Sequence, residues 1–112
     1  MVVIYHNPRC MTSRKTLALL EKKGVKPKVI EYLKTPPSAA ELTRLLKMLG
    51  KTPRELMRSK EAREAGLNKP GLTDSALIAA MVKNPIVIER PIVVNGSHAA
   101  LGRPPEAVLE IL

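Results

Sequence analysis

The hydrophobic and polar positions of the N-terminal part of the chain change from a strand-like to a helix-like pattern and back. Residues 2–5 form a short apolar, β-branched run, which predicts a buried strand. A helix is expected to begin between Cys10 and Thr12 and to end near Gly24, a residue suited to a left-handed cap. Residues 28–32 predict a second strand. A strand, a helix and a strand in this order predict a βαβ unit with parallel strands.

The middle of the chain carries helix signals without strand signals. Ser38 and Glu41 have the spacing of a capping box at the start of a helix. Leucines with helical spacing follow it: Leu42, Leu45, Leu46 and Leu49. Thr52 and Thr73 mark two further helix starts, and the charged residues 59–71 predict a loop around a small helical piece.

The C-terminal part returns to strand patterns. Residues 92–94 and 98–101 flank an Asn-Gly pair ending at Gly96, which predicts a β-hairpin. A last helix is expected to open at Pro104. The order is therefore β-α-β, a helical insertion at about residues 36–84, and β-β-α. It predicts a thioredoxin-like α/β fold with a mixed four-stranded sheet.

Length and composition agree with one globular domain over residues 1–112. The chain is 45% hydrophobic and 26% charged, and only 2% of its residues are aromatic, so the expected core is aliphatic. No apolar run approaches the roughly 20 residues of a membrane span. The first residues lack the basic and apolar segments of a signal peptide, and we therefore expect a cytoplasmic protein.

The charge balance is strongly basic, with a formal net charge of +9. Nucleic acids, acidic membranes and small oxyanions all attract such a chain. Nucleic-acid binders of the stacking type need exposed aromatic side chains, of which this sequence has almost none. The basic residues are also spread along the chain. Nucleic-acid binding is accordingly the last-ranked of the alternatives.

Cys10 is the only cysteine, so an intrachain disulfide and a thiol-rich metal site are both excluded. Its predicted position at the start of a helix favours an anion, because unpaired backbone N–H groups and the helix dipole meet there. Flanking arginines, Arg9 and Arg14, add positive charge that lowers a thiol pKa. The alternative is a small buried hydrophobe, but the residue follows Asn-Pro-Arg rather than an apolar stripe. A reactive thiolate is the favoured interpretation.

Other side chains offer chemistry near such a thiol. His6 precedes the cysteine by four residues and either stabilises the thiolate or fills a strand-end hydrogen-bonding role. Arg90 stands before Pro91, a candidate cis bond, and Arg58 and Arg103 are further candidates for gripping a tetrahedral oxyanion. Taken singly, each arginine is typical of a solvated surface charge. Two histidines without a carboxylate cluster predict no metal site.

Three separated segments together resemble one family. Residues 5–14, Tyr-His-Asn-Pro-Arg-Cys-Met-Thr-Ser-Arg, are similar to the active-site segment of the glutaredoxin-linked arsenate reductase (ArsC) family. Residues 89–94 and 101–106 resemble its two later signatures, and Arg58 falls where the family carries another functional arginine. The resemblance extends from the first strand to the last helix.

The resemblance implies a reaction. Cys10 would attack arsenate to form a covalent thiol–arsenate adduct, while His6 and Ser13 would help to keep the thiol ionised. Arsenate binding would fall to three arginines: Arg58, Arg90 and Arg103. Glutathione as co-substrate and glutaredoxin as partner would then release arsenite, with no bound cofactor and a monomeric protein. Independently of the resemblance, a chain with one cysteine needs external thiols to complete a redox cycle.

Two departures from the family pattern change this expectation in detail. Met11 stands where the well-studied reductases have a small residue, which predicts a more crowded helix start. The chain stops at Leu112, whereas longer members continue, and in this respect it resembles a short ArsC-like subgroup.

Two other classes of protein share parts of this pattern. Spx-like transcriptional regulators have the fold and the Arg-Pro signature but bind RNA polymerase. Many of them sense oxidants through Cys-x-x-Cys, and Ser13 here replaces the second cysteine. A general monothiol glutathione-dependent oxidoreductase is compatible with Cys-x-x-Ser. That function does not explain the presence of Arg58, Arg90 and Arg103.

Overall fold

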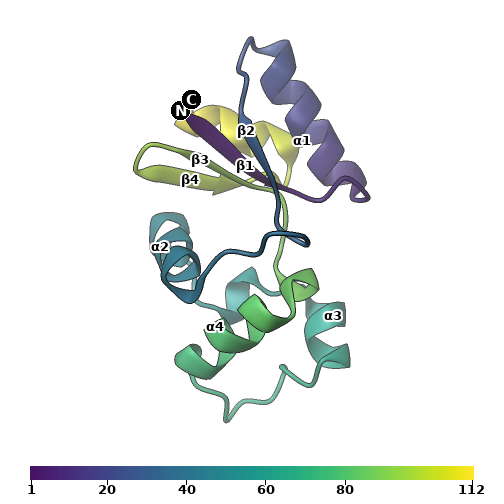
Figure 1. Cartoon of the computed structure of the whole chain (residues 1–112), viewed down its shortest axis with the longest axis vertical. Helices are drawn as coiled ribbons and strands as arrows, with labels where there is room; N and C mark the ends of the chain where they lie inside the picture. The colour runs from purple at the N-terminus through teal and green to yellow at the C-terminus, as the bar shows by residue number, and fades with distance from the viewer. The chain divides into compact units, whose positions relative to one another are not determined.

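The computed structural model describes residues 1–112 and divides the chain into two compact units. The sheet unit consists of Met1–Thr35 and Arg90–Leu112, and the helical unit consists of Pro36–Glu89. Figure 1 shows the elements of each unit, which are described separately below. Every helix is too short or too polar to cross a membrane.

The sheet unit contains four strands in the order β2-β1-β3-β4. Their bounds are Val2–His6 for β1, Lys28–Glu31 for β2, Ile92–Asn95 for β3 and His98–Leu101 for β4. β1 and β2 are parallel, whereas β1 pairs with β3 and β3 pairs with β4 in antiparallel fashion. The mixed four-stranded sheet and the parallel first pair are therefore confirmed (Figure 1).

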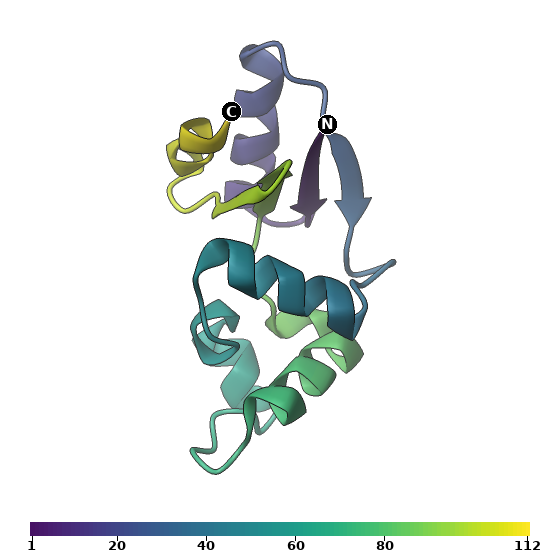
Figure 2. The same ribbon diagram turned by 90° about the vertical axis from the view of Figure 1, so that its left-hand side faces the viewer.

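One face of this sheet is covered by α1 (Met11–Lys22) and by the 3₁₀ helix η3 (Pro105–Ile111), as Figure 2 shows. The core beneath them consists of Ile4, Leu20, Val93 and Val108, all fully buried. Side chains alternate between the faces of a strand, so every second residue of β1 and β3 reaches this core. The last helix was expected as an ordinary helix, and the structure instead has the tighter 3₁₀ form.

The buried residues of α1 differ in part from the stripe that hydrophobic spacing predicts, which consists of Leu17, Leu19 and Leu20. Leu17 and Leu19 are only partly buried, while Ser13, Thr16 and Leu20 are buried. The polar positions are buried because the first turns of α1 lie against the strand ends rather than over the aliphatic core. Hydrophobic spacing therefore predicted Leu20 correctly but did not predict the burial of Ser13 and Thr16.

The predicted hairpin is present, with a turn shifted by one residue. Asn95 pairs with His98, which leaves Gly96 and Ser97 as the two turn residues. Gly96 has a φ of 62°, a value that favours glycine. The Asn95 side chain donates to the carbonyl of Ile111 at 2.7 Å and thereby ties η3 to the hairpin.

The helical unit contains three α helices and two 3₁₀ helices: α2 (Ala39–Leu49), η1 (Arg54–Leu56), α3 (Ser59–Glu64), α4 (Asp74–Lys83) and η2 (Pro85–Val87). The start of α2 is the predicted capping box, in which Ser38 Oγ accepts from Glu41 N at 3.1 Å. Thr73 caps α4 in the same way. The small helical piece expected within residues 59–71 is α3.

The segments that leave η1 and η2 are joined to each other. Met57 and Ile88 form an antiparallel bridge, Arg58 N donates to Val87 O at 2.8 Å, and Glu89 N donates to Leu56 O at 2.7 Å. These bonds place Arg58 and Glu89 on neighbouring stretches of backbone.

Candidate active site

Cys10 is the residue at which α1 begins. It is the N-cap, with extended backbone angles (φ −92°, ψ 121°), and its carbonyl accepts the first helical bond from Arg14 N at 3.0 Å. No side chain caps this helix, and its first turn has no acidic residue. The N–H groups of the first turn are consequently available to an anion, and the thiol is the side chain placed to use them.

A tight turn brings the chain from β1 to this helix. Cys10 N donates to Asn7 O at 3.0 Å, and Arg9 N donates to the side-chain oxygen of Asn7 at 3.0 Å. Asparagine favours such turns because its short side chain replaces a backbone acceptor. Asn7 is buried, so this turn is a fixed part of the site.

The surroundings of the Cys10 sulfur favour its anion. Partial burial raises the pKa of Cys10, but hydrogen bonds from the Ser13 backbone and the Arg90 side chain outweigh it. The charge of Arg90 and the Thr12 backbone act in the same direction, and the net pKa of the thiol is lowered. Hydrogen bonds to the charged form and a nearby cation are the expected causes of such a shift.

His6 lies at the end of β1 and contacts the first turn of α1. Its Nδ1 is 2.7 Å from Ser13 Oγ, and the same hydroxyl accepts from Asn7 N at 3.1 Å. Burial lowers the pKa of His6, with Glu31 opposing and Arg14 assisting this effect. The imidazole is therefore held neutral at neutral pH and fixes the Ser13 hydroxyl.

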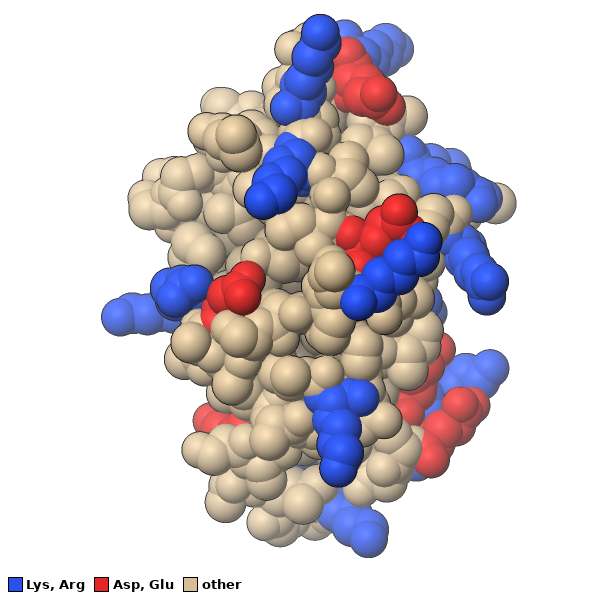
Figure 3. Space-filling model, in the orientation of Figure 1, with Lys and Arg blue, Asp and Glu red and all other residues tan.

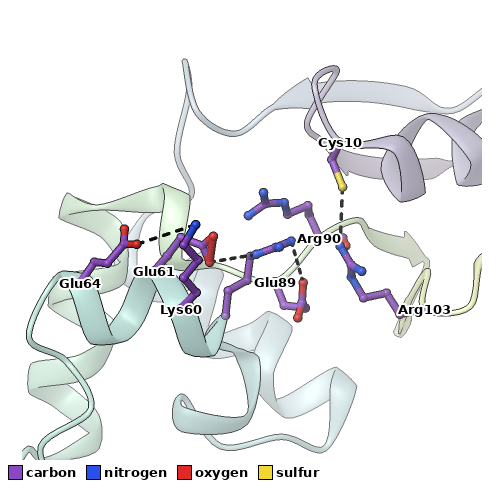
Figure 4. Close-up of polar contacts among 8 residues, drawn as sticks. Cys10, Lys60, Glu61, Glu64, Glu89, Arg90 and Arg103 are labelled. Carbon is purple, nitrogen blue, oxygen red and sulfur yellow. Dashed lines mark hydrogen bonds and ion pairs between the residues drawn. The ribbon is translucent and has the colours of Figure 1, made fainter.

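Two arginines at the base of the β3–β4 hairpin complete the surroundings of the sulfur. Arg103 Nη2 donates to Cys10 Sγ at 3.6 Å, and Arg103 Nε donates to the carbonyl of Arg90 at 2.8 Å (Figure 4). The peptide bonds that precede Pro91 and Pro104 are both cis; the first was predicted and the second was not. The structure thus brings together Cys10, His6, Ser13, Arg90 and Arg103.

Gly102 is a site residue that sequence reasoning missed. Its N–H donates to Pro91 O at 3.0 Å, and an added Cβ would lie 2.5 Å from Thr16 Oγ1 and 2.7 Å from Pro91 Cγ. Only glycine allows the end of β4 to approach α1 this closely. Arg103 is the next residue, so this packing places its guanidinium at the sulfur. A glycine directly before the Arg-Pro pair was the available signal.

Arg58 lies in the helical unit, where two carboxylates hold it. Its Nε is 3.1 Å from Glu61 Oε2, and its Nη1 is 3.5 Å from Glu89 Oε1. The bridge between Met57 and Ile88 orients this ion-paired group. The assignment of arsenate binding to Arg58 stays a prediction.

Charged side chains do not form one large patch on the face drawn in Figure 3. On the face drawn in Figure 3, lysines and arginines are scattered among uncharged residues rather than gathered in one patch. No group of three or more His, Cys, Asp or Glu side chains in residues 1–112 is placed to hold a metal ion.

Comparisons with known proteins identify the family of this chain. The sequence profile described as "ArsC family" matches residues 5–111. The chain belongs to the ArsC family. It is 56% identical to the "Uncharacterized protein YfgD" of Escherichia coli K12 over 99% of this chain and 96% of that protein. It is 48% identical to an arsenate reductase of Rhizobium meliloti, over 99% of this chain and 81% of the relative.

Solved structures show that the similarity extends to the fold. An arsenate reductase from Vibrio cholerae is 54% identical and superposes with a TM-score of 0.94, over 99% of this chain and 97% of that one. The thioredoxin-like fold expected for an ArsC chain is therefore confirmed.

Proposed function

We propose that this ArsC-family protein reduces arsenate to arsenite with Cys10 as the nucleophile. The observation that carries the proposal is the position of the thiol, at the uncapped start of α1 and 3.6 Å from the Arg103 guanidinium. The relatives and solved structures named arsenate reductases support the same reaction.

The first step is attack of the Cys10 thiolate on arsenic. A sulfur–arsenic bond forms and one arsenate oxygen leaves as water, so that arsenic stays in the +5 state. Arg103 and Arg90 lie where they would offset the negative charge of the adduct oxygens. By resemblance to the family, Arg58 contributes to this binding as well. His6 and Ser13 support the step by holding the first turn of α1, whose N–H groups stabilise the thiolate.

Reduction of arsenic from +5 to +3 needs two electrons, and the chain holds only one cysteine. We therefore assign both electrons to external thiols. Glutathione attacks the adduct and displaces a second oxygen as water, which gives a species with both sulfurs on arsenic. A glutaredoxin thiolate then attacks the glutathione sulfur, and the arsenic–sulfur electron pair stays on arsenic. Hydrolysis of the remaining bond releases arsenite and returns Cys10.

The position corresponding to a resolving cysteine supports this assignment. Ser13 stands three residues after the nucleophile, and its hydroxyl is engaged by His6 and by Asn7 N. A serine cannot form the disulfide that a Cys-x-x-Cys protein would use.

The test is arsenate-dependent oxidation of NADPH in the presence of glutathione, glutaredoxin and glutathione reductase. We expect turnover with the wild-type protein and none with Cys10→Ser. Arg44→Ala, which removes an exposed arginine of α2, is the matched control and should keep the wild-type rate. A wild-type rate equal to that of Cys10→Ser would overturn the proposal.

A further inference from the structure

A cavity of about 200 Å³ lies beside the turn that carries the nucleophile. Two segments of the sheet unit line it: residues 6–9, from the last residue of β1 onward, form one wall, and Glu31, Leu33 and Lys34, from the last residue of β2 onward, form the other. His6 and Glu31 are register partners on the parallel strands, so both segments leave the sheet at the same edge. The mechanism proposed above does not use this cavity.

The lining of the cavity contains both negatively and positively charged side chains. Glu31 supplies a carboxylate, and Lys34 Nζ lies 3.5 Å from it in a pair whose lysine is 78% exposed. Such a solvated pair is weak and gives way to a better partner. On the other wall Arg9 is exposed and has no carboxylate within ion-pair distance. The cavity therefore offers an acceptor for an ammonium group and two cations for a carboxylate.

Apolar surface completes the lining. Pro8 and Leu33 both face the cavity, and Leu33 is one of the few large hydrophobic side chains that the protein exposes. One carboxylate, two cations and a short apolar wall match the head group of an α-amino acid, with its ammonium, its carboxylate and its methylene chain.

The distance from this cavity to the sulfur fits one particular thiol. The Asn7–Cys10 hydrogen bond closes a four-residue turn, so the Cα atoms at its two ends lie within about 7 Å. Glutathione carries a free amino-acid head group one γ-glutamyl residue away from its cysteine. An extended residue spans roughly 3.5 Å, and the longer γ-linkage increases that reach. The head group can occupy the cavity while the glutathione sulfur approaches Cys10.

We propose that this cavity binds the γ-glutamyl head group of glutathione, with its ammonium on Glu31 and its carboxylate between Arg9 and Lys34. The inference rests on the proposed function, because it concerns the thiol that attacks the arsenate adduct. The inference adds a binding site for glutathione, formed by residues other than the arginines proposed to bind arsenate.

Binding is tested first without chemistry. S-methylglutathione cannot act as a reductant, and the protein has two histidines, of which His6 lines the cavity and His98 lies on the hairpin. In a proton NMR titration of the full chain, the His6 ring signals should shift in a saturable way while those of His98 stay in place. Equal shifts of both histidines, or no shift of His6, would overturn the proposal.

Variants of the chain and of the ligand define the contact. Glu31→Gln should weaken S-methylglutathione binding about tenfold, as expected for the loss of one charged hydrogen bond. Glu21→Gln, which neutralises an exposed carboxylate of α1, is the matched control and should bind as the wild type does. S-methyl-cysteinylglycine, which lacks the γ-glutamyl residue, should leave His6 unshifted. Equal binding of the two ligands would contradict the assignment.

Kinetics separate this inference from the proposed function. The measured quantity is the kcat/KM ratio of glutathione to 2-mercaptoethanol as the attacking thiol. Glu31→Gln should lower this ratio about tenfold and Glu21→Gln should leave it in place. An absence of arsenate turnover with either thiol overturns the proposed function, whereas turnover with an unchanged ratio overturns only the glutathione site.

Discussion

Helices α2 and α4 of the helical unit differ from α1 of the sheet unit in how the N–H groups of their first turns are satisfied. In the helical unit, α2 begins with a capping box of Ser38 and Glu41, and α4 begins with Thr73 and an acidic residue. In the sheet unit, α1 begins at Cys10 with neither a side-chain cap nor an acid in its first turn. Helices α2 and α4 thus have side-chain caps, and α3 has no cap but carries Glu61 in its first turn, whereas α1 leaves its first N–H groups to a sulfur anion.

The arginines of the two units show the same contrast. Arg58 contacts the carboxylates of Glu61 and Glu89, which balance its charge. Arg103 donates instead to a sulfur and to a neutral carbonyl oxygen. The Arg103 guanidinium is therefore directed at the sulfur, where the oxygens of a bound oxyanion would lie.

The largest expected effect follows from this second contrast. Arg103→Ala should lower kcat/KM for arsenate about 100-fold, the usual result of removing one donor to a developing oxyanion. Arg58→Ala should cost clearly less, because Glu61 and Glu89 already neutralise that guanidinium. Steady-state kinetics on both variants give the comparison. A larger loss in Arg58→Ala would reverse the ranking of the two arginines.

Gly102→Ala tests how the chain positions Arg103. The new Cβ would meet Thr16 and Pro91 at less than contact distance, so we expect a loss of about 1–3 kcal/mol in unfolding free energy. Urea denaturation measures that loss. Because the backbone must shift, alkylation of Cys10 at neutral pH should slow as well. Unchanged stability and thiol reactivity would show that this close packing is unimportant.

Removing the N-cap side chain of α2 and adding one to α1 should change the free energy of unfolding in opposite directions. Ser38→Ala removes the cap of α2 and should cost about 1 kcal/mol. Cys10→Ser gives α1 a hydroxyl cap and should raise stability by a few tenths of a kcal/mol to about 1 kcal/mol while abolishing activity. Urea denaturation of both variants is the measurement, and a destabilised Cys10→Ser would contradict the account of α1.

The smallest effect concerns the first turn of α1 itself. Met11 is 60% exposed, and Met11→Glu would place a carboxylate beside the N–H groups that stabilise the thiolate. The pKa of Cys10 should rise, since the nearby negative charge disfavours the anion and occupies its donors. The pH profile of iodoacetamide alkylation should move to higher pH, with a rate a few-fold lower at neutral pH. Met11→Gln is the neutral control.

Local patterns were sufficient for most of the fold. The apolar run at residues 2–5, the capping box at Ser38 and the Asn-Gly turn each specify an element through nearby residues alone. The buried face of α1 was predicted less well, because Thr16 is buried by contact with Gly102, which is remote in sequence. Such packing leaves no periodic signal along the chain.

For the candidate site, too, features set by neighbouring residues were predictable and features set by contacts between remote residues were not. Cys10 and its place at a helix start were readable from adjacent residues, as was the Arg90–Pro91 cis bond. The role of Asn7 in the turn and the bond from Arg103 to the Arg90 carbonyl depend on three-dimensional contacts. Sequence alone therefore supplied the reacting groups but not the distances between them.

The register of the β3–β4 hairpin has a consequence for the active site. Ile92 pairs with Leu101, and the strand ends so aligned continue directly into Arg90 and Arg103. The two-residue turn at the opposite end thus sets the spacing of two positive charges at the sulfur. An insertion at Gly96 that shifted the register would change that spacing without touching Cys10 or either arginine, so the length of a surface turn controls the placement of both charges.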